Sequence, residues 1–222
     1  MIARLGGNAV KVTRGGQASL PSEYQEVEYI EPVGNAYIDP NVNITTNIGF
    51  KLTMNIPSNA VHGTIIGQYL PGNYNFFLYS YDDGRTTLFS TYQGPTYSVN
   101  FPRDMKATYS FINGVSYSYY DGSTFTVPEY ATHEVGQPLL IFTGRSNNFF
   151  SSFKLYKDTQ IYIGNTAIRS FIPCYRKSDN EPGVYDTINN TFYSNSGNGY
   201  FNIGNEVSDP KTNFEINIKP NV

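Results

Sequence analysis

Alternation of apolar and polar residues over positions 47–56 is the feature that most constrains the fold of this chain. Its apolar members all fall on one side of an extended strand: Ile48, Phe50, Leu52, Met54 and Ile56. The residues between them are small or polar: Gly49, Lys51, Thr53 and Asn55. A period of two is typical of a strand that packs one face on a core and turns the other to water. We therefore predict a strand over 47–56.

The residue choice extends this preference to the whole chain. Strong helix formers are scarce, with 8 Ala, 9 Leu and 3 Met, whereas the strand-favouring aromatics reach 20 Tyr and 15 Phe. Turn formers are frequent, with 20 Gly, 13 Pro and 24 Asn. A chain of this length hides about 70 % of its surface on folding, so it can build one full core. We expect an all-β protein of many short strands.

Three turn signals predict hairpins. Asn113-Gly114 separates two alternating segments and accepts the positive φ angles of a type I′ turn, and Asp83-Gly84 and Asp121-Gly122 are further candidates. Further strands are expected at 64–69, 74–81, 85–91, 107–112, 115–120, 138–143, 150–156, 160–163, 167–172, 191–194 and 200–203. Short strands at this spacing, without an internal repeat, favour a two-sheet antiparallel sandwich or jelly roll over a single barrel or a propeller.

The ends of the chain differ from its middle. Residues 1–18 are Gly-rich, lack carboxylates and carry Arg4, Lys11 and Arg14, so we predict an extended basic arm that anchors the protein to an acidic partner surface. The alternative is a frayed terminus. Residues 19–205 form the predicted sandwich domain. Residues 206–222 end in another alternating segment, which either adds a strand to a neighbour's sheet or completes the protein's own sandwich.

Catalytic patterns are absent from the sequence. Glycan hydrolysis on a strand requires carboxylates at i, i+2 and i+4, but Glu26 and Glu28 are followed by Ile30. His62 and His133 are the only histidines, neither lies beside a nucleophile turn, and the single Cys174 cannot form an internal disulfide. We expect a protein that is not an enzyme, with a glycan hydrolase as a minor alternative.

Charge and hydropathy exclude two kinds of partner. The formal net charge of −3 opposes binding to nucleic acid, because that affinity depends mainly on neutralising phosphates. No apolar run approaches the roughly 20 residues of a membrane-spanning helix. We therefore expect neither a nucleic-acid partner nor membrane insertion.

Two regions carry a family resemblance. The first contains LPSEYQEVEYIE (20–31) and GNAYID (34–39), and the second contains FIPCYRKSD (171–179), GVYD (183–186) and TFYSNSG (191–197). Together they resemble the LamG-like, concanavalin A-like lectin/glucanase modules of bacteriophage virion proteins of the tail, baseplate or capsid. The resemblance covers about residues 20–204. It implies a concanavalin A-like jelly roll, a place on the particle surface, and many copies per particle, with a homotrimer as one arrangement.

The FIPCYRKSD run also has a direct physical interpretation. Phe171, Pro173 and Tyr175 are expected to pack in a closing strand. The polar residues that follow, from Arg176 to Asp179, are expected to form a turn whose charges pair locally. We therefore predict that this run maintains the fold.

Tyrosines beside polar residues predict a shallow glycan site. A tyrosine offers a flat apolar ring and a hydroxyl, which suit the two kinds of surface on a sugar. The candidate residues are Tyr74, Tyr79, Tyr81, Asp83, Arg85, Arg145 and Asn147. The alternative is that these tyrosines are half-buried packing residues. Calcium is a second candidate ligand, because Asn73, Asn75, Asp82 and Asp83 offer hard oxygens, although such residues are also ordinary turn formers.

These observations lead to two hypotheses of different classes. The first is a non-enzymatic virion protein that presents a lectin-like jelly roll to host-surface glycans and contacts other virion proteins through its arm. The second is a structural protein that decorates or cements the capsid, or assembles the tail, without binding sugar.

Overall fold

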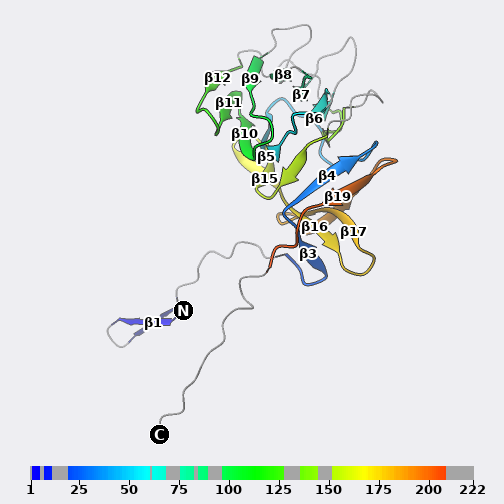
Figure 1. The fold of residues 1–222 in the computed structure, drawn as a ribbon. Helices are drawn as coiled ribbons and strands as arrows, with labels where there is room; N and C mark the ends of the chain where they lie inside the picture. Colours follow the sequence, from blue (N-terminus) through cyan, green and yellow to red (C-terminus); the bar gives the residue numbers. More distant parts are fainter. Residues whose placement is uncertain are drawn as a thin grey trace.

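The computed structural model describes residues 2–5, 8–11, 20–60, 62–68, 76–82, 85–89, 97–127, 136–144 and 152–208. Within these ranges the regular elements are all strands (Figure 1). No helix of the described ranges is long and apolar enough to cross a membrane. The expected all-β architecture is confirmed.

The larger sheet is built around β5 (Ile48–Asn55). On one side of β5 lie β10 (Ala107–Ile112), β11 (Val115–Ser118) and β12 (Thr124–Thr126). On the other side lie β15 (Thr159–Ile163), β16 (Thr166–Arg176), β17 (Glu181–Asp186) and β18 (Thr191–Ser194). Four short strands branch from this path: β14 (Lys154–Tyr156) pairs with β5 and with β4 (Tyr29–Val33), β19 (Tyr200–Ile203) pairs with β4, and β3 (Tyr24–Glu26) pairs with β16.

The second sheet has five strands in the order β13-β6-β7-β8-β9. Their bounds are β13 (Leu140–Ile141), β6 (Gly63–Gln68), β7 (Phe76–Ser80), β8 (Arg85–Phe89) and β9 (Tyr97–Asn100). All strand pairs in both sheets are antiparallel within the described ranges. The two-sheet antiparallel sandwich is thus confirmed.

The core lies between the two sheets. The ring of Phe50 on β5 is 6.0 Å from the ring of Phe76 on β7, and Phe76 is 5.8 Å from Phe111 on β10, with distances taken between ring centroids. The apolar positions of the 47–56 segment are completely buried, as the alternation predicts. The intervening residue Lys51 therefore points away from the five-stranded sheet.

The hairpin predictions hold where the structure describes them. Asn113 and Gly114 have φ angles of 50° and 79° and connect β10 to β11. Gly122, with a φ of 71°, lies between β11 and β12, which also pair. β7 and β8 form the third pair, although Asp83 and Gly84 lie outside the described residues.

Several strands were not among the expected ones. β17 begins with Glu181-Pro-Gly, a sequence typical of a turn, yet it pairs with both β16 and β18. β4 contains Pro32 and pairs with β14 and β19. These non-local pairings override the local turn and breaker signals.

The two ends of the chain have different structures. At the N-terminus, β1 (Ile2–Leu5) pairs only with β2 (Asn8–Lys11) in a separate two-stranded sheet, which Figure 1 draws apart from the sandwich. Near the C-terminus, Val207 donates a 2.9 Å backbone hydrogen bond to Glu26 O. The start of the 206–222 extension therefore joins the protein's own domain, and the rest of that extension, from residue 209, lies outside the described residues.

Candidate functional site

Two of the predicted sugar-binding tyrosines meet at the end of β7. Because Phe76 and Leu78 face the core, the intervening residues Phe77 and Tyr79 lie on the outer face of the five-stranded sheet. The Tyr79 and Tyr81 rings are 4.9 Å apart in an edge-to-face arrangement, and both side chains are partly exposed. This pair provides ring surface at the rim of the sheet.

Charged groups surround the tyrosine pair. The imidazole of His62 is stacked 6.3 Å from the Tyr79 ring. Its Nδ1 atom lies 3.0 Å from Asp82 Oδ2, and the His62 backbone N–H donates to Asp82 Oδ1 at 2.6 Å. The Arg103 guanidinium donates to the backbone oxygens of Tyr81 and Pro57. We call His62, Tyr79, Tyr81, Asp82 and Arg103 the Tyr81 cluster.

The charges of this cluster are accessible to solvent. The side chains of His62 and Asp82 are 50 % and 67 % exposed. The hydrogen bonds from His62 hold the pKa of the Asp82 carboxyl below its usual value, with a smaller contribution from the charge of Arg103. The cluster therefore presents a carboxylate, an imidazole and aromatic rings together at neutral pH.

Only part of the predicted glycan site falls within the described residues. Tyr79 and Tyr81 come together. Tyr74, Asp83, Arg145 and Asn147 lie outside the described residues, and for Arg85 the backbone alone is described, as the first residue of β8. The sequence interpretation missed His62 and Arg103, which long-range pairing brings to the site. Arg103 reaches it through an isolated bridge with Ile56, a contact that no local pattern signals.

The calcium hypothesis has one described ligand candidate. Asp82 uses both carboxylate oxygens on His62, and Asn73, Asn75 and Asp83 lie outside the described residues. No group of three or more His, Cys, Asp or Glu side chains that could hold a metal ion occurs in the described part of the chain. Calcium binding remains a prediction.

Glu26 and Glu28, the two carboxylates considered for catalysis, bind different partners. Glu26 forms an ion pair with Lys157, with Lys157 Nζ 3.0 Å from Oε1 and 3.2 Å from Oε2. Glu28 accepts a 3.2 Å hydrogen bond from Asn205 Nδ2. Each carboxylate binds a different neighbouring segment, so contacts within the fold explain why two glutamates occur here.

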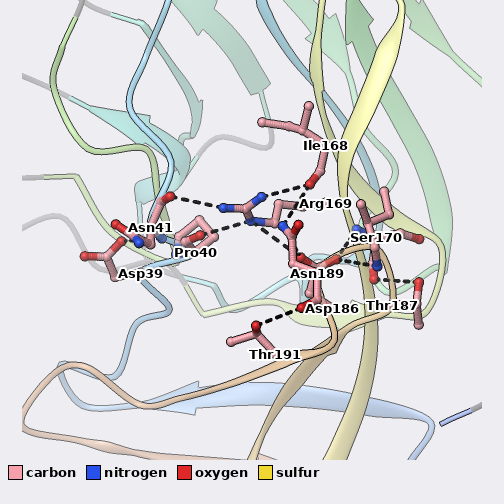
Figure 2. Close-up of polar contacts among 11 residues, drawn as sticks. Asp39, Pro40, Asn41, Ile168, Arg169, Ser170, Asp186, Thr187, Asn189 and Thr191 are labelled. Carbon is pink, nitrogen blue, oxygen red and sulfur yellow. Dashed lines mark hydrogen bonds and ion pairs between the residues drawn. The ribbon is translucent and has the colours of Figure 1, made fainter.

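A second polar cluster centres on Arg169 and Asp186 (Figure 2). The Asp186 side chain is completely buried, and Oδ1 accepts from the backbone N–H groups of Ser170 and Ile188 at 2.9 and 3.0 Å. Its Oδ2 atom accepts from Asn189 Nδ2 at 3.0 Å and lies 3.5 Å from Arg169 Nε.

Arg169 uses its remaining donors on backbone carbonyls. It donates to Pro40 O, Asn41 O and Ile168 O at 3.1, 3.1 and 2.9 Å, respectively (Figure 2). The cluster thereby fastens the 39–41 segment to β16 and β17. Since its donors and acceptors are occupied by the protein, we interpret it as a structural clamp rather than as a binding site.

The FIPCYRKSD run has the fold-maintaining role expected of it. Phe171 is buried, and Arg176 Nη2 forms a 2.6 Å ion pair with Asp179 Oδ2. The Tyr175 hydroxyl donates to Glu206, which ties β16 to the start of the C-terminal extension. The predicted local charge pairing is confirmed.

A third set of side chains lies on the outer face of the larger sheet. Strand register places Tyr117, Ser110, Lys51 and Gln160 in one row across β11, β10, β5 and β15. Lys51 Nζ lies 5.9 Å from the centroid of the Tyr119 ring, and Tyr119 is 57 % exposed. The sequence alternation predicted that Lys51 faces water but could not identify its neighbours on the other strands.

Comparisons with known proteins assign no family to this chain. No family model matches the chain, and no curated protein matches it. Among solved structures, the chain is similar to the crystal structure of native heptameric SAP-like pentraxin from Limulus polyphemus. The TM-score is 0.41 at 9 % sequence identity, over 81 % of this chain and 90 % of that chain. At this distance the likeness carries no functional argument, and the fold rests on the strand pairing described above.

Proposed function

We propose that the chain is a non-enzymatic, lectin-like β-sandwich that a bacteriophage particle displays for binding host-surface glycans. The assignment to a virion rests on the sequence resemblance of residues 20–204 to phage modules. The assignment to glycan binding rests on the Tyr81 cluster. The two parts are independent and need separate tests.

The composition of the Tyr81 cluster is the observation that carries the binding proposal. A sugar ring has an apolar C–H face that packs on an aromatic ring, and hydroxyl groups that exchange hydrogen bonds with charged or polar side chains. Tyr81 supplies ring surface, and the exposed pair of His62 and Asp82 supplies polar atoms within the same cluster. These groups lie at the end of a paired strand and contact one another, which favours a single arrangement before a ligand arrives.

Multivalent display compensates for the weak binding of a shallow site. Several copies on one particle raise the effective affinity by about 10² to 10⁴ when their geometry allows simultaneous binding. The N-terminal segment supports display because β1 and β2 form a sheet of their own, outside the sandwich. The predicted contacts of this segment with other virion proteins are Arg4, Lys11 and Arg14.

The non-enzymatic assignment is supported by how the carboxylates are used. Glu26 and Glu28 bind Lys157 and Asn205, on different segments, instead of facing one another across a sugar site. Hydrolysis with two carboxylates requires them to flank one glycosidic bond. Release of reducing ends from host polysaccharide that is abolished by Glu28→Gln would contradict the non-enzymatic assignment.

A structural decoration or assembly protein is the alternative function. One observation favours it: β19 carries exposed apolar side chains, with Tyr200 59 % and Ile203 40 % exposed. Such residues on a strand that pairs only with β4 in the described structure suit contact with a neighbouring subunit.

A binding assay with three variants separates the two functions. The wild-type chain, Tyr81→Ala and Tyr200→Ala are each coupled to beads at high density and applied to host cells and a glycan array. The first function predicts that Tyr81→Ala loses retention while Tyr200→Ala keeps it, because both tyrosines are accessible to solvent at least in part but only Tyr81 belongs to the cluster.

The same variants are then tested for incorporation into particles. Loss of occupancy with Tyr200→Ala, together with no glycan retention by the multivalent wild-type protein, would reject glycan binding in favour of the structural function. Full occupancy after deletion of residues 2–18 would contradict the anchoring role of the N-terminal segment.

A further inference from the structure

The outer face of the larger sheet has the chemistry of a second binding surface. We define the Lys51 face as Lys51, Ser110, Tyr117, Tyr119, Gln160 and Tyr162. It lies on the side of the sheet opposite the core, because Phe50, next to Lys51, packs on the five-stranded sheet. Proteins commonly cover such a face with other elements, but Lys51, Tyr117, Gln160 and Tyr162 are all partly exposed and Tyr119 is largely exposed.

Large and small side chains alternate across this face. Tyr117 on β11 and Gln160 on β15 flank Ser110 and Lys51 in one row, and Ser110 is small and 4 % exposed. In the neighbouring row, Tyr162 is paired with Gly49, where an added Cβ atom would lie 2.6 Å from Phe111 O. Tyrosines therefore stand on β11 and β15, with Ser110 and Gly49 on the two strands between them.

Two tyrosines of this face are in contact at the end of β11. The Tyr117 and Tyr119 rings are 4.5 Å apart in an edge-to-face arrangement. Burial raises the pKa of Tyr162, and the nearby phenol of Tyr119 adds to that rise. Lys51 reaches the Tyr119 ring from β5, and Gln160, its cross-strand partner on β15, accepts from the Tyr162 hydroxyl, so Tyr119 and Tyr162 belong to the same local surface.

The two rows of paired residues on this face carry positive charge only. Lys51 is the one charged residue in the rows formed by Tyr117, Ser110, Lys51 and Gln160 and by Gly49 and Tyr162. Among the described residues Lys51 forms no ion pair, and its ammonium group lies over the Tyr119 ring. Asp121, two residues after Tyr119, accepts from the backbone N–H of Ser123.

Polar side chains of this face and of β16 are linked by hydrogen bonds. The Tyr162 hydroxyl donates to Gln160 Oε1 at 2.7 Å, and Gln160 Nε2 is 3.5 Å from Ser170 Oγ. A face of hydroxyl, amide and aromatic groups around one ammonium is too polar for a permanent interface between copies, whose centres are depleted of charge. It matches a ligand that has hydroxyl groups, apolar ring faces and one negative charge.

We propose that the Lys51 face binds an acidic saccharide, with Lys51 Nζ donating to a sugar carboxylate and Tyr119 packing on a sugar ring. This inference rests on the proposed function, to which it adds a second surface and a ligand class. It is independent of the Tyr81 cluster, which lies on the other sheet.

The experiment compares carboxylated polysaccharides with their neutral methyl esters. The probes are fragments of polygalacturonate, alginate, hyaluronan and polysialate, each offered as the free acid and as the ester to the bead-coupled protein. The wild type is expected to bind at least one acid about tenfold tighter than its ester, since a charge-assisted hydrogen bond contributes that much. The preference is expected to fall as ionic strength rises.

Variants locate the binding. Lys51→Met is expected to remove the preference for the acid, Lys51→Arg to retain it, and Tyr119→Ala to weaken acid and ester alike. Lys106→Met is the matched control, because Lys106 Nζ also lies over a tyrosine ring, 4.6 Å from the Tyr156 centroid. Lys106 directly precedes β10 and lies about 13 Å along the strand direction from Ser110. Thermal unfolding of each variant verifies that it folds.

The outcomes separate this inference from the proposed function. Equal binding of acid and ester by the wild type, or a preference that survives Lys51→Met, would overturn the role of Lys51 even if Tyr81-dependent glycan binding persists. Acid binding that is lost in Lys51→Met but kept in Tyr81→Ala would support the Lys51 face as a surface separate from the Tyr81 cluster. Concentration-dependent self-association that Tyr119→Ala abolishes would reassign the face to a contact between copies.

Discussion

Arg169 and Asp186 form an ion pair on the neighbouring strands β16 and β17, with the side chain of Asp186 completely shielded from water and that of Arg169 15 % exposed. The carboxylate also accepts hydrogen bonds from two backbone N–H groups and from Asn189. A buried charge contributes stability only while its partners remain in place.

Removal of this carboxylate should therefore lower the stability of the folded protein. Asp186→Ala leaves the Arg169 guanidinium without its partner and is expected to lower the free energy of unfolding by about 3 kcal/mol. Thermal or urea unfolding measures the change. Asp179→Ala is the matched control, since it breaks an ion pair whose side chains are 41 % and 47 % exposed. Equal destabilisation by the two substitutions would contradict the clamp.

The hydroxyl groups of Tyr109 and Ser116 are hydrogen-bonded to each other inside the core. Tyr109→Phe leaves the Ser116 hydroxyl buried without a partner and is expected to cost about 2 kcal/mol. Adding Ser116→Ala to that variant should recover part of the loss, because no unpaired polar group then remains. A double-mutant cycle measures the coupling, and strictly additive losses would show that the two hydroxyls act independently.

Ser80 and Thr86 are cross-strand partners on β7 and β8, and both of their buried hydroxyls lack a hydrogen-bond partner in the described structure. Thr86→Val keeps the side-chain shape and removes an unsatisfied polar group, so it is expected to raise the free energy of unfolding by about 1 kcal/mol. Thr124→Val, on the exposed edge strand β12, provides a control at which no such gain is expected. Destabilisation by Thr86→Val would indicate that the hydroxyl is satisfied, for example by an ordered water.

Cys174 is the only cysteine, and burial raises the pKa of its thiol to about 12. The native protein should therefore hold it as an unreactive thiol, and alkylation by iodoacetamide at pH 8 is expected to be far slower than in urea. Because the folded pKa lies above the unfolded one, this group favours folding below about pH 9 and loses that contribution as the pH rises towards 12. Mass spectrometry of timed aliquots measures the reaction, and equal rates in the two states would refute the burial.

Local sequence signals predicted much of the sandwich. The 47–56 alternation and the Asn113-Gly114 turn each act over a few residues, so they could be recognised without tertiary information. β17 was not predicted because Glu181-Pro-Gly favours a turn locally, whereas its pairing with β16 and β18 depends on the whole sheet.

The candidate sites were predicted less completely for the same reason. Tyr79 and Tyr81 are close in sequence, but Arg103 binds Tyr81 from 22 residues away. The Lys51 face combines four strands, and only their register reveals that Tyr117, Lys51 and Gln160 share one row. Composition indicated that tyrosines are abundant but could not assign them to the core, an interface or a binding surface.

The imidazole of His62 offers the most direct test of the central claim that the Tyr81 cluster binds host-surface glycan. The chain has 2 histidines, so each can be assigned in a proton NMR spectrum by comparison with His62→Gln. Titration with the saccharide retained in the array assay is expected to shift the His62 resonances in a saturable manner, and Tyr81→Ala should abolish that shift. His62 resonances that stay unchanged while the saccharide saturates the protein would contradict the account.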